Sequence, residues 1–144
     1  MGPAARERVY VALGSNLGDR SAHLHLARRA LAALPGTTLL AESSVEETAP
    51  LGGMDQPPYL NQMVLLETEL PPRALLEACQ AIEGEAGRVR TVRWGPRTLD
   101  VDIVRFGDRH LAEPDLIIPH PELPNRDFWQ RELAELQPYD RTPT

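Results

Sequence analysis

Two aspartates, Asp100 and Asp102, are separated by a single apolar residue in the segment TLDVDIV, residues 98–104. Apolar residues alternate with them, and this period of two predicts a half-buried strand with both carboxylates on one face. Their backbones would lie roughly 6.6 Å apart along the strand. Hard divalent cations prefer oxygen ligands, and neighbouring carboxylates can bridge two metal ions about 4 Å apart. The pattern therefore predicts a magnesium site.

A basic segment leads directly into this strand. It reads RVRTVRWGPR, is broken by a Gly-Pro pair, contains no acid and holds four arginines, Arg88, Arg90, Arg93 and Arg97. Guanidinium groups bind phosphate oxygens in a bidentate manner, so these arginines and the aspartates together indicate phosphoryl transfer. A D-x-D pair by itself usually lies on a solvated strand face, but the adjoining Arg, Trp and Gly-Pro cluster favours the metal interpretation.

The rest of the chain predicts the elements that position these residues. Apolar periodicity and Gly or Pro stops predict strands at about 8–13, 37–48, 60–70 and 98–104, and helices at 21–34, 71–87 and 125–136. GSNLGD lacks the lysine and the spacing of a P-loop and predicts a tight strand-to-helix turn. We expect a turn-rich connection at 106–115 and a cap on the final helix. This order predicts an α+β fold, a ferredoxin-like βαββαβ sandwich with a mostly antiparallel sheet and helices packed on it.

Length, charge and cysteine content limit the class of protein. The 144 residues with 42% hydrophobic content fit one domain spanning residues 1–144. A formal charge of −6 and a pI of about 5.2 disfavour a nucleic acid or an anionic membrane as the main partner. The single cysteine, Cys79, excludes an internal disulfide, and its helical position predicts burial. No apolar run has the length of a membrane span or a signal peptide, so we expect a cytoplasmic protein.

Residues of the central loop and the following strand could hold a flat ligand. The segment APLGGMDQPPY, residues 49–59, has two adjacent glycines and three prolines, and long loops in small domains are commonly functional. Tyr59 offers a ring face, and Asn61 offers an amide that can both donate and accept. Asn61 could equally be an ordinary strand-end residue.

Three further polar residues lie near the predicted phosphate binders. Gln80 and Glu83, about one turn apart, precede the arginine segment and could flank its ligand or be ordinary surface residues. His120 lies between two prolines and near Arg126. A lone histidine is usually a structural hydrogen-bonding residue, but this one lies in a rigid segment that favours a ligand contact.

Four motifs resemble those of the 6-hydroxymethyl-7,8-dihydropterin pyrophosphokinase family of folate biosynthesis. They are VALGSNLGDR, ETAPLGGMDQPPYLNQ, GRVRTVRWGPRTLDVDIVRFG and LIIPHPELPNRDF, and the resemblance covers about residues 8–137. It implies a ferredoxin-like α+β monomer that transfers the β,γ-diphosphate of ATP to the pterin hydroxymethyl group and releases AMP. It also implies the use of two magnesium ions, with no nucleic-acid or membrane partner.

The resemblance further implies roles for individual residues. Asp100 and Asp102 would bind both magnesium ions, and Arg88 and Arg97 would hold the phosphates and guide the transferring group. The pterin would contact Thr48, Pro50, Leu51, Gly52, Tyr59, Asn61, Trp94 and Phe128. ATP would contact Gln80, Glu83, Arg88, Arg90, Arg93, Trp94, Arg97, Ile103, His120 and Arg126.

Two other classes of function stay open. A different magnesium-dependent nucleotidyl- or phosphotransferase could use the same aspartates with another acceptor, and release of ADP rather than AMP would favour it. A ferredoxin-like module could instead bind RNA through its arginines, although the aromatic residues expected on the strand faces are missing. Salt-sensitive RNA retention without ATP turnover would favour that class.

Overall fold

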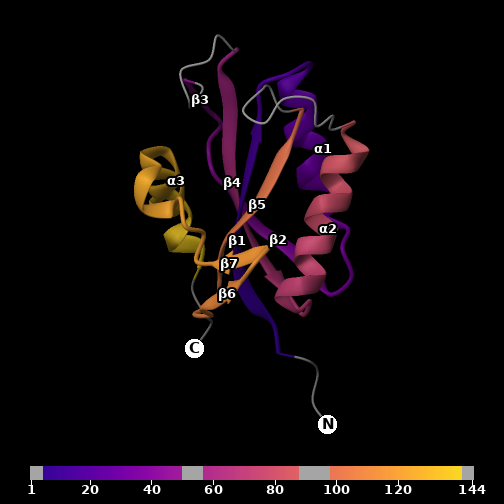
Figure 1. Ribbon diagram of the computed structural model, residues 1–144, viewed down its shortest axis with the longest axis vertical. Coiled ribbons are helices and arrows are strands. Elements are labelled where there is room, and N and C mark those ends of the chain that lie inside the picture. Colours follow the sequence, from indigo (N-terminus) through magenta and orange to yellow (C-terminus); the bar gives the residue numbers. More distant parts are fainter. Residues whose placement is uncertain (1–4, 50–56, 88–97, 141–144) are drawn as a thin grey trace.

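The computed structural model describes residues 5–49, 57–87 and 98–140 of the chain (Figure 1). Eight predicted site residues lie outside these ranges, namely Pro50, Leu51, Gly52, Arg88, Arg90, Arg93, Trp94 and Arg97. No helix in the described ranges is both long and apolar enough to cross a bilayer.

Five antiparallel strands form the main sheet. The strands are β1 (Glu7–Ser15), β2 (Thr37–Glu42), β3 (Glu46–Thr48), β4 (Tyr59–Thr68) and β5 (Asp100–Phe106). Their order is β2-β4-β1-β5, and β3 pairs with β4 beyond the end of β2. The C-terminal end of β1 therefore meets the N-terminal ends of β4 and β5 at one end of the sheet (Figure 1).

The predicted single strand at 37–48 is two strands, β2 and β3, because Ser43 interrupts it. The Ser43 hydroxyl accepts a hydrogen bond from Met63 N–H at 2.9 Å, and Ser43 N–H donates to the Met63 carbonyl at 2.9 Å. A side-chain acceptor thus replaces a backbone acceptor at this point, and the regular ladder stops.

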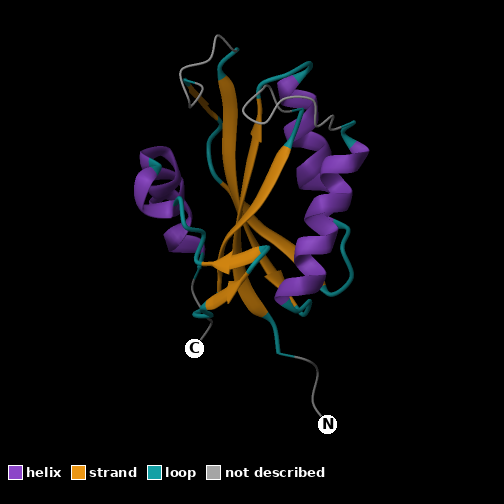
Figure 2. Cartoon of the chain, viewed as in Figure 1, coloured by secondary structure: helices purple, strands orange, loops and turns teal. Residues whose placement is uncertain are grey.

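Helices cover both faces of the sheet (Figure 2). Helices α1 (Arg20–Ala32) and α2 (Pro72–Glu85) pack on the face formed by alternate β1 residues such as Val11. Helix α3 (Asp127–Leu136) packs on the other face, against Tyr10 and Ala12. The predicted ferredoxin-like α+β fold is confirmed. The predicted cap of the last helix is wrong, because Arg126 at the N-cap position makes no side-chain capping bond.

A short hairpin begins within the turn-rich connection predicted at 106–115, so that prediction is wrong in part. Strands β6 (Leu111–Glu113) and β7 (Leu116–Ile118) pair with each other, and 3-10 turns at Leu123–Asn125 and Gln137–Tyr139 flank α3. Arg73 of α2 forms ion pairs with Glu113 and Asp115 of this hairpin. Just after β7, His120 N–H donates to the Val104 carbonyl of β5 at 2.9 Å. These contacts bring the segment before α3 beside β5.

The predicted turn after the first strand is confirmed. Gly18 has a φ of +73°, a conformation that favours glycine. Asp19 then caps α1 by accepting a hydrogen bond from Ala22 N–H at 3.1 Å. Asn16, in the same turn, donates to the Pro57 carbonyl at 3.1 Å. The turn is thereby held beside the start of β4.

Candidate active site

The two aspartates lie at the start of β5 on one face of the sheet. The strand register places Asp100 opposite Gly14 and Asp102 opposite Ala12, whereas Val101 between them packs into the core on the α1 and α2 side. Both aspartates are half-buried. The prediction that the carboxylates share a face is confirmed, and this face is the one that carries α3.

A glutamate from α2 holds the backbone between the aspartates. Glu83 Oε2 accepts a hydrogen bond from Val101 N–H at 2.9 Å, and Glu83 is 7% exposed. Among the residues that the structure describes, strand β5 pairs with β1 alone in the main sheet. Glu83 therefore supplies an acceptor on the side of β5 where no other described strand pairs. Its predicted contact with ATP stays a prediction, beside this structural role.

Thr48, Tyr59 and Asn61 lie together on the same sheet face as the aspartates. Thr48 is opposite Tyr59, and the Asn61 amide donates a hydrogen bond to Thr48 Oγ1. Asn61 is also opposite Gly14, which is in turn opposite Asp100. Strands β4 and β5 are separated only by β1, hence by about 10 Å. One small ligand can therefore contact the polar residues of β3 and β4 and the carboxylates of β5 together.

Gly14, at the centre of this row, was not predicted to belong to the site. A Cβ atom at this position would lie 3.2 Å from Asn61 Oδ1 and 3.6 Å from Tyr59 Cδ1. A side chain here would therefore press on the Asn61 amide. A glycine within a strand pattern often marks a close approach, and this is the sequence signal that could have identified it.

His120, Arg126 and Phe128 gather around Trp129 at the start of α3. The His120 and Trp129 rings are edge-on with centroids 4.9 Å apart, the Arg126 guanidinium lies 4.4 Å from the Trp129 ring centroid, and the Phe128 and Trp129 centroids are 6.3 Å apart. Arg126 Nε is buried and has no hydrogen-bond partner among the described residues. No prediction named Trp129, which is 2% exposed and supports this cluster.

The environment of His120 fixes its protonation. Burial, and then the positive charge of Arg126, lower the pKa of the imidazole. The Nδ1 atom accepts a hydrogen bond from Glu122 N–H at 3.0 Å. A neutral ring that accepts at Nδ1 carries its proton on Nε2. His120 can therefore act as a neutral hydrogen-bond donor toward a ligand.

The other two predicted ATP contacts, Gln80 and Ile103, are not brought onto this face. Gln80 is exposed on α2. Ile103 is 5% exposed, pairs with Val11 and packs in the core between the sheet and the first two helices. Both assignments stay predictions.

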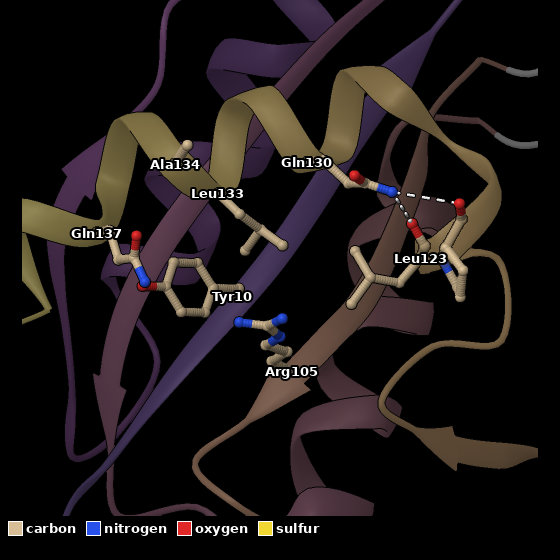
Figure 3. A pocket seen from close by; sticks show the side chains of 8 residues that line it. Tyr10, Arg105, Leu123, Gln130, Leu133, Ala134 and Gln137 are labelled. Atoms are coloured by element: carbon tan, nitrogen blue, oxygen red, sulfur yellow. Dashed lines mark hydrogen bonds between the residues drawn. The ribbon is translucent and has the colours of Figure 1, made fainter.

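A hollow of about 450 Å³ lies between α3 and the strands beside it (Figure 3). Tyr10 and Arg105 line it from the sheet, and Gln130, Leu133 and Gln137 line it from the helix. None of the predicted site residues that the structure describes lines this hollow. The hollow therefore does not coincide with the site around Asp100 and Asp102.

The carboxylate oxygens at the aspartate face suit a magnesium ion that is bound together with a phosphate. Among residues 5–49, 57–87 and 98–140, no group of three or more His, Cys, Asp or Glu side chains is arranged to hold a metal. Magnesium is commonly bound through one or two carboxylates and completes its shell with water and substrate phosphates. Asp100 and Asp102 fit that requirement.

This fold and face define a ferredoxin-like α+β protein suited to chemistry on phosphates. A family model described as 7,8-dihydro-6-hydroxymethylpterin-pyrophosphokinase (HPPK) matches residues 10–138. The chain belongs to this family, whose reaction is a step of folate biosynthesis.

Several relatives are similar over most of their length. The 2-amino-4-hydroxy-6-hydroxymethyldihydropteridine pyrophosphokinase of Pseudomonas aeruginosa is 48% identical over 137 residues, which are 95% of this chain and 85% of the relative. The proteins of the same name from Haemophilus influenzae and Bacillus subtilis are 47% and 46% identical, over 83% and 89% of this chain and 75% and 77% of the relatives.

Proposed function

We propose that this pyrophosphokinase transfers the β,γ-diphosphate of ATP to 6-hydroxymethyl-7,8-dihydropterin, with Asp100 and Asp102 as ligands of two magnesium ions. One observation supports this most directly. Asn61, Gly14 and Asp100 form a single row across three adjacent strands. A pterin bound at Asn61 would therefore lie beside phosphates held at the aspartates.

The reaction needs positioning and charge stabilisation more than a strong base. The hydroxymethyl oxygen forms a bond to the β-phosphorus, the bond from that phosphorus to the α,β-bridging oxygen breaks, and AMP leaves while the hydroxyl proton is lost. Magnesium, when bound, offsets the charge on the transferring group. Asp100 and Asp102 would fix its place, and Arg88 and Arg97 would hold the phosphates. The neutral His120 would donate from Nε2 to an oxygen of the nucleotide.

The remaining contacts form part of the same proposal. The pterin would be held by Thr48, Pro50, Leu51, Gly52, Tyr59, Asn61, Trp94 and Phe128. ATP would be held by Gln80, Glu83, Arg90, Arg93, Trp94, Ile103, His120 and Arg126. We also propose that residues 1–144 act as a single domain and a monomer in the cytoplasm, where ATP is available.

The test is release of AMP from ATP in the presence of magnesium and the pterin. We expect Asp100→Asn and Asp102→Asn each to lower kcat on the order of 100- to 1000-fold, because each removes an anionic ligand of the magnesium that would offset the charge of the transition state. Asp108→Asn is the matched control, since Asp108 is exposed and lies just beyond the other end of β5.

Thermal unfolding of all three variants checks that the fold is kept. Near-normal rates in both site variants would contradict the proposal. Release of ADP instead of AMP would indicate a different phosphotransferase.

A further inference from the structure

Two glutamates from different elements face each other beneath α3. Glu132 of α3 is 1% exposed, and Glu46 of β3 is partly buried. Three of their oxygens, Glu46 Oε2 and both oxygens of Glu132, are buried and have no hydrogen-bond donor among the described residues. Burying two ionised carboxylates side by side is strongly unfavourable. A single proton between the two groups removes one charge and provides the missing donor.

The surrounding charges decide which glutamate carries the proton. Arg131 Nε lies 3.1 Å from Glu46 Oε1. A hydrogen bond from Glu132, and then Arg131, lower the pKa of Glu46. Burial, and then the hydrogen bond with Glu46 and its charge, raise the pKa of Glu132 to about 9, with Arg131 opposing and Glu135 adding to the shift. At neutral pH Glu132 is therefore a neutral acid that donates to the Glu46 carboxylate.

Strand β3 connects this pair to the pterin side of the site. Glu46 and Thr48 lie on the same face of β3, and Glu46 is opposite Asn61, whose amide donates to Thr48. The strand has three residues and, within the described part of the chain, pairs with β4 alone. So short a strand gains few ladder hydrogen bonds, and its position depends on what packs against its face.

Helix α3 also holds the bend before β3, through a different kind of contact. Glu135 Oε1 accepts from Ser44 N–H at 2.8 Å, and its Oε2 accepts from the Ser44 hydroxyl at 3.0 Å. Here one carboxyl group accepts from two donors, so no shared proton is needed. Both contacts hold the β3 region against α3, and only the contact between Glu46 and Glu132 needs a proton between two carboxyl groups.

We propose that Glu46 and Glu132 share one proton, and that this acid–carboxylate pair holds β3, with Thr48 and Asn61, in the position that binds the pterin. The part that concerns the pterin rests on the proposed function. Loss of the proton to solvent leaves two buried anions on opposing elements, and their repulsion moves β3 away from α3. Both glutamates are positioning residues for this site.

The first experiment measures the proton directly. In protein labelled with ¹³C at the glutamate carboxyls, the Glu132 resonance is identified by its loss in Glu132→Gln. We expect its midpoint near pH 9, and a lower midpoint in Glu46→Gln, because the neighbouring charge is gone while the burial remains. A Glu132 carboxyl that is already ionised at pH 7 would overturn the proposal.

The second experiment measures affinity for the pterin between about pH 7.5 and 10. Glu132→Gln keeps a donor toward Glu46 and cannot ionise. Dividing the wild-type dissociation constant by that of Glu132→Gln removes the ionisation of the ligand itself. We expect this ratio to rise about tenfold at one pH unit above the midpoint. Glu135→Gln is the matched control, and its affinity for the pterin should fall at alkaline pH as that of the wild type does.

A Glu132→Gln protein that loses affinity as steeply as the wild type would refute the positioning role. Failure of the proposed function can be told apart from this result. If neither protein binds the pterin at pH 7.5, the ¹³C midpoint still reports the shared proton, and amide hydrogen exchange in β3 reports its effect. Alkaline exchange in β3 that is faster in the wild type than in Glu132→Gln supports the proposal, and equal rates overturn it.

Discussion

Replacing Glu83 by alanine should destabilise the protein and misplace the aspartate pair. In Glu83→Ala the Val101 N–H, which now donates to Glu83 Oε2 at 2.9 Å, loses its acceptor in a site that is 7% exposed. An unsatisfied buried donor costs about 1–3 kcal/mol. For a chain of this size that loss corresponds to a fall in Tm of roughly 3–10 °C. Glu83→Gln keeps a carbonyl acceptor and should lose about half as much, because neutral hydrogen bonds are weaker than charge-assisted ones.

Urea and thermal unfolding measure the stability change, with Glu85→Ala as the control. Glu85 is exposed on the same last turn of α2 and has no hydrogen bond or ion pair with another described residue, so its removal should change stability by less than about 0.5 kcal/mol. If Glu83→Ala and Glu85→Ala have the same free energy of unfolding, the hydrogen bond between Glu83 and Val101 is not a stabilising contact.

Kinetics separate the two roles of Glu83. Val101 lies between Asp100 and Asp102, so a shift of its backbone should lower kcat on the order of tenfold to a hundredfold, and loss of the proposed nucleotide contact should also raise the KM for ATP. A variant with normal kcat and a raised KM for ATP would instead show that Glu83 acts through the nucleotide alone.

Three other substitutions or probes test the neighbouring contacts. Gly14→Ala should raise the KM for the pterin and leave that for ATP unchanged, because its methyl group lies 3.2 Å from Asn61 Oδ1; Gly84→Ala, with nothing within 4 Å, is the control. The Cys79 thiol, whose pKa is raised to about 12 by burial and then by the carboxylates of Asp102 and Glu83, should react with a thiol reagent at pH 8 only as fast as the protein opens, and rapid reaction of the folded protein would contradict this. Burial lowers the folded pKa of His120, so the stability linked to its neutral form is present above its unfolded pKa of about 6.5 and is lost as pH falls through the lower folded value. The difference in urea stability between the wild type and His120→Gln should therefore shrink as pH falls. An NMR titration midpoint of His120 at or above 6.5 would contradict this prediction.

The strand faces could be predicted from the sequence because a period of two is a local property. Asp100 and Asp102 alternate with apolar residues, and this alone fixes their common face. The division of residues 37–48 into two strands could not be predicted in this way. The break at Ser43 depends on a hydrogen bond to Met63, which is distant in sequence, and no local pattern distinguishes it from an ordinary strand residue.

The roles of Glu132 and Glu83 depend on tertiary contacts, although the helical pattern gives a sequence signal for each. Glu132 follows Trp129 by three residues and precedes Leu136 by four, so it falls on the apolar stripe of α3. An acid on such a stripe predicts a buried carboxyl that needs a partner. Glu83 likewise lies on the buried face of α2, beside Ile82. In neither case does the helical pattern identify the partner, since Glu46 and Val101 lie on other elements.

Strands β3 and β5 carry predicted site residues on the two sides of the main sheet. In residues 5–49, 57–87 and 98–140, β5 pairs with β1 alone and β3 pairs with β4 alone, so no described strand fixes either of them on its other side. A carboxyl group from a helix holds each of them, Glu83 from α2 on β5 and Glu132 from α3 on β3. Because β4 and β1 lie between the two contacts, perturbing them should have different effects. Loss of Glu83 should act mainly on kcat through the aspartates, whereas ionisation of Glu132 should act mainly on pterin affinity through Thr48 and Asn61.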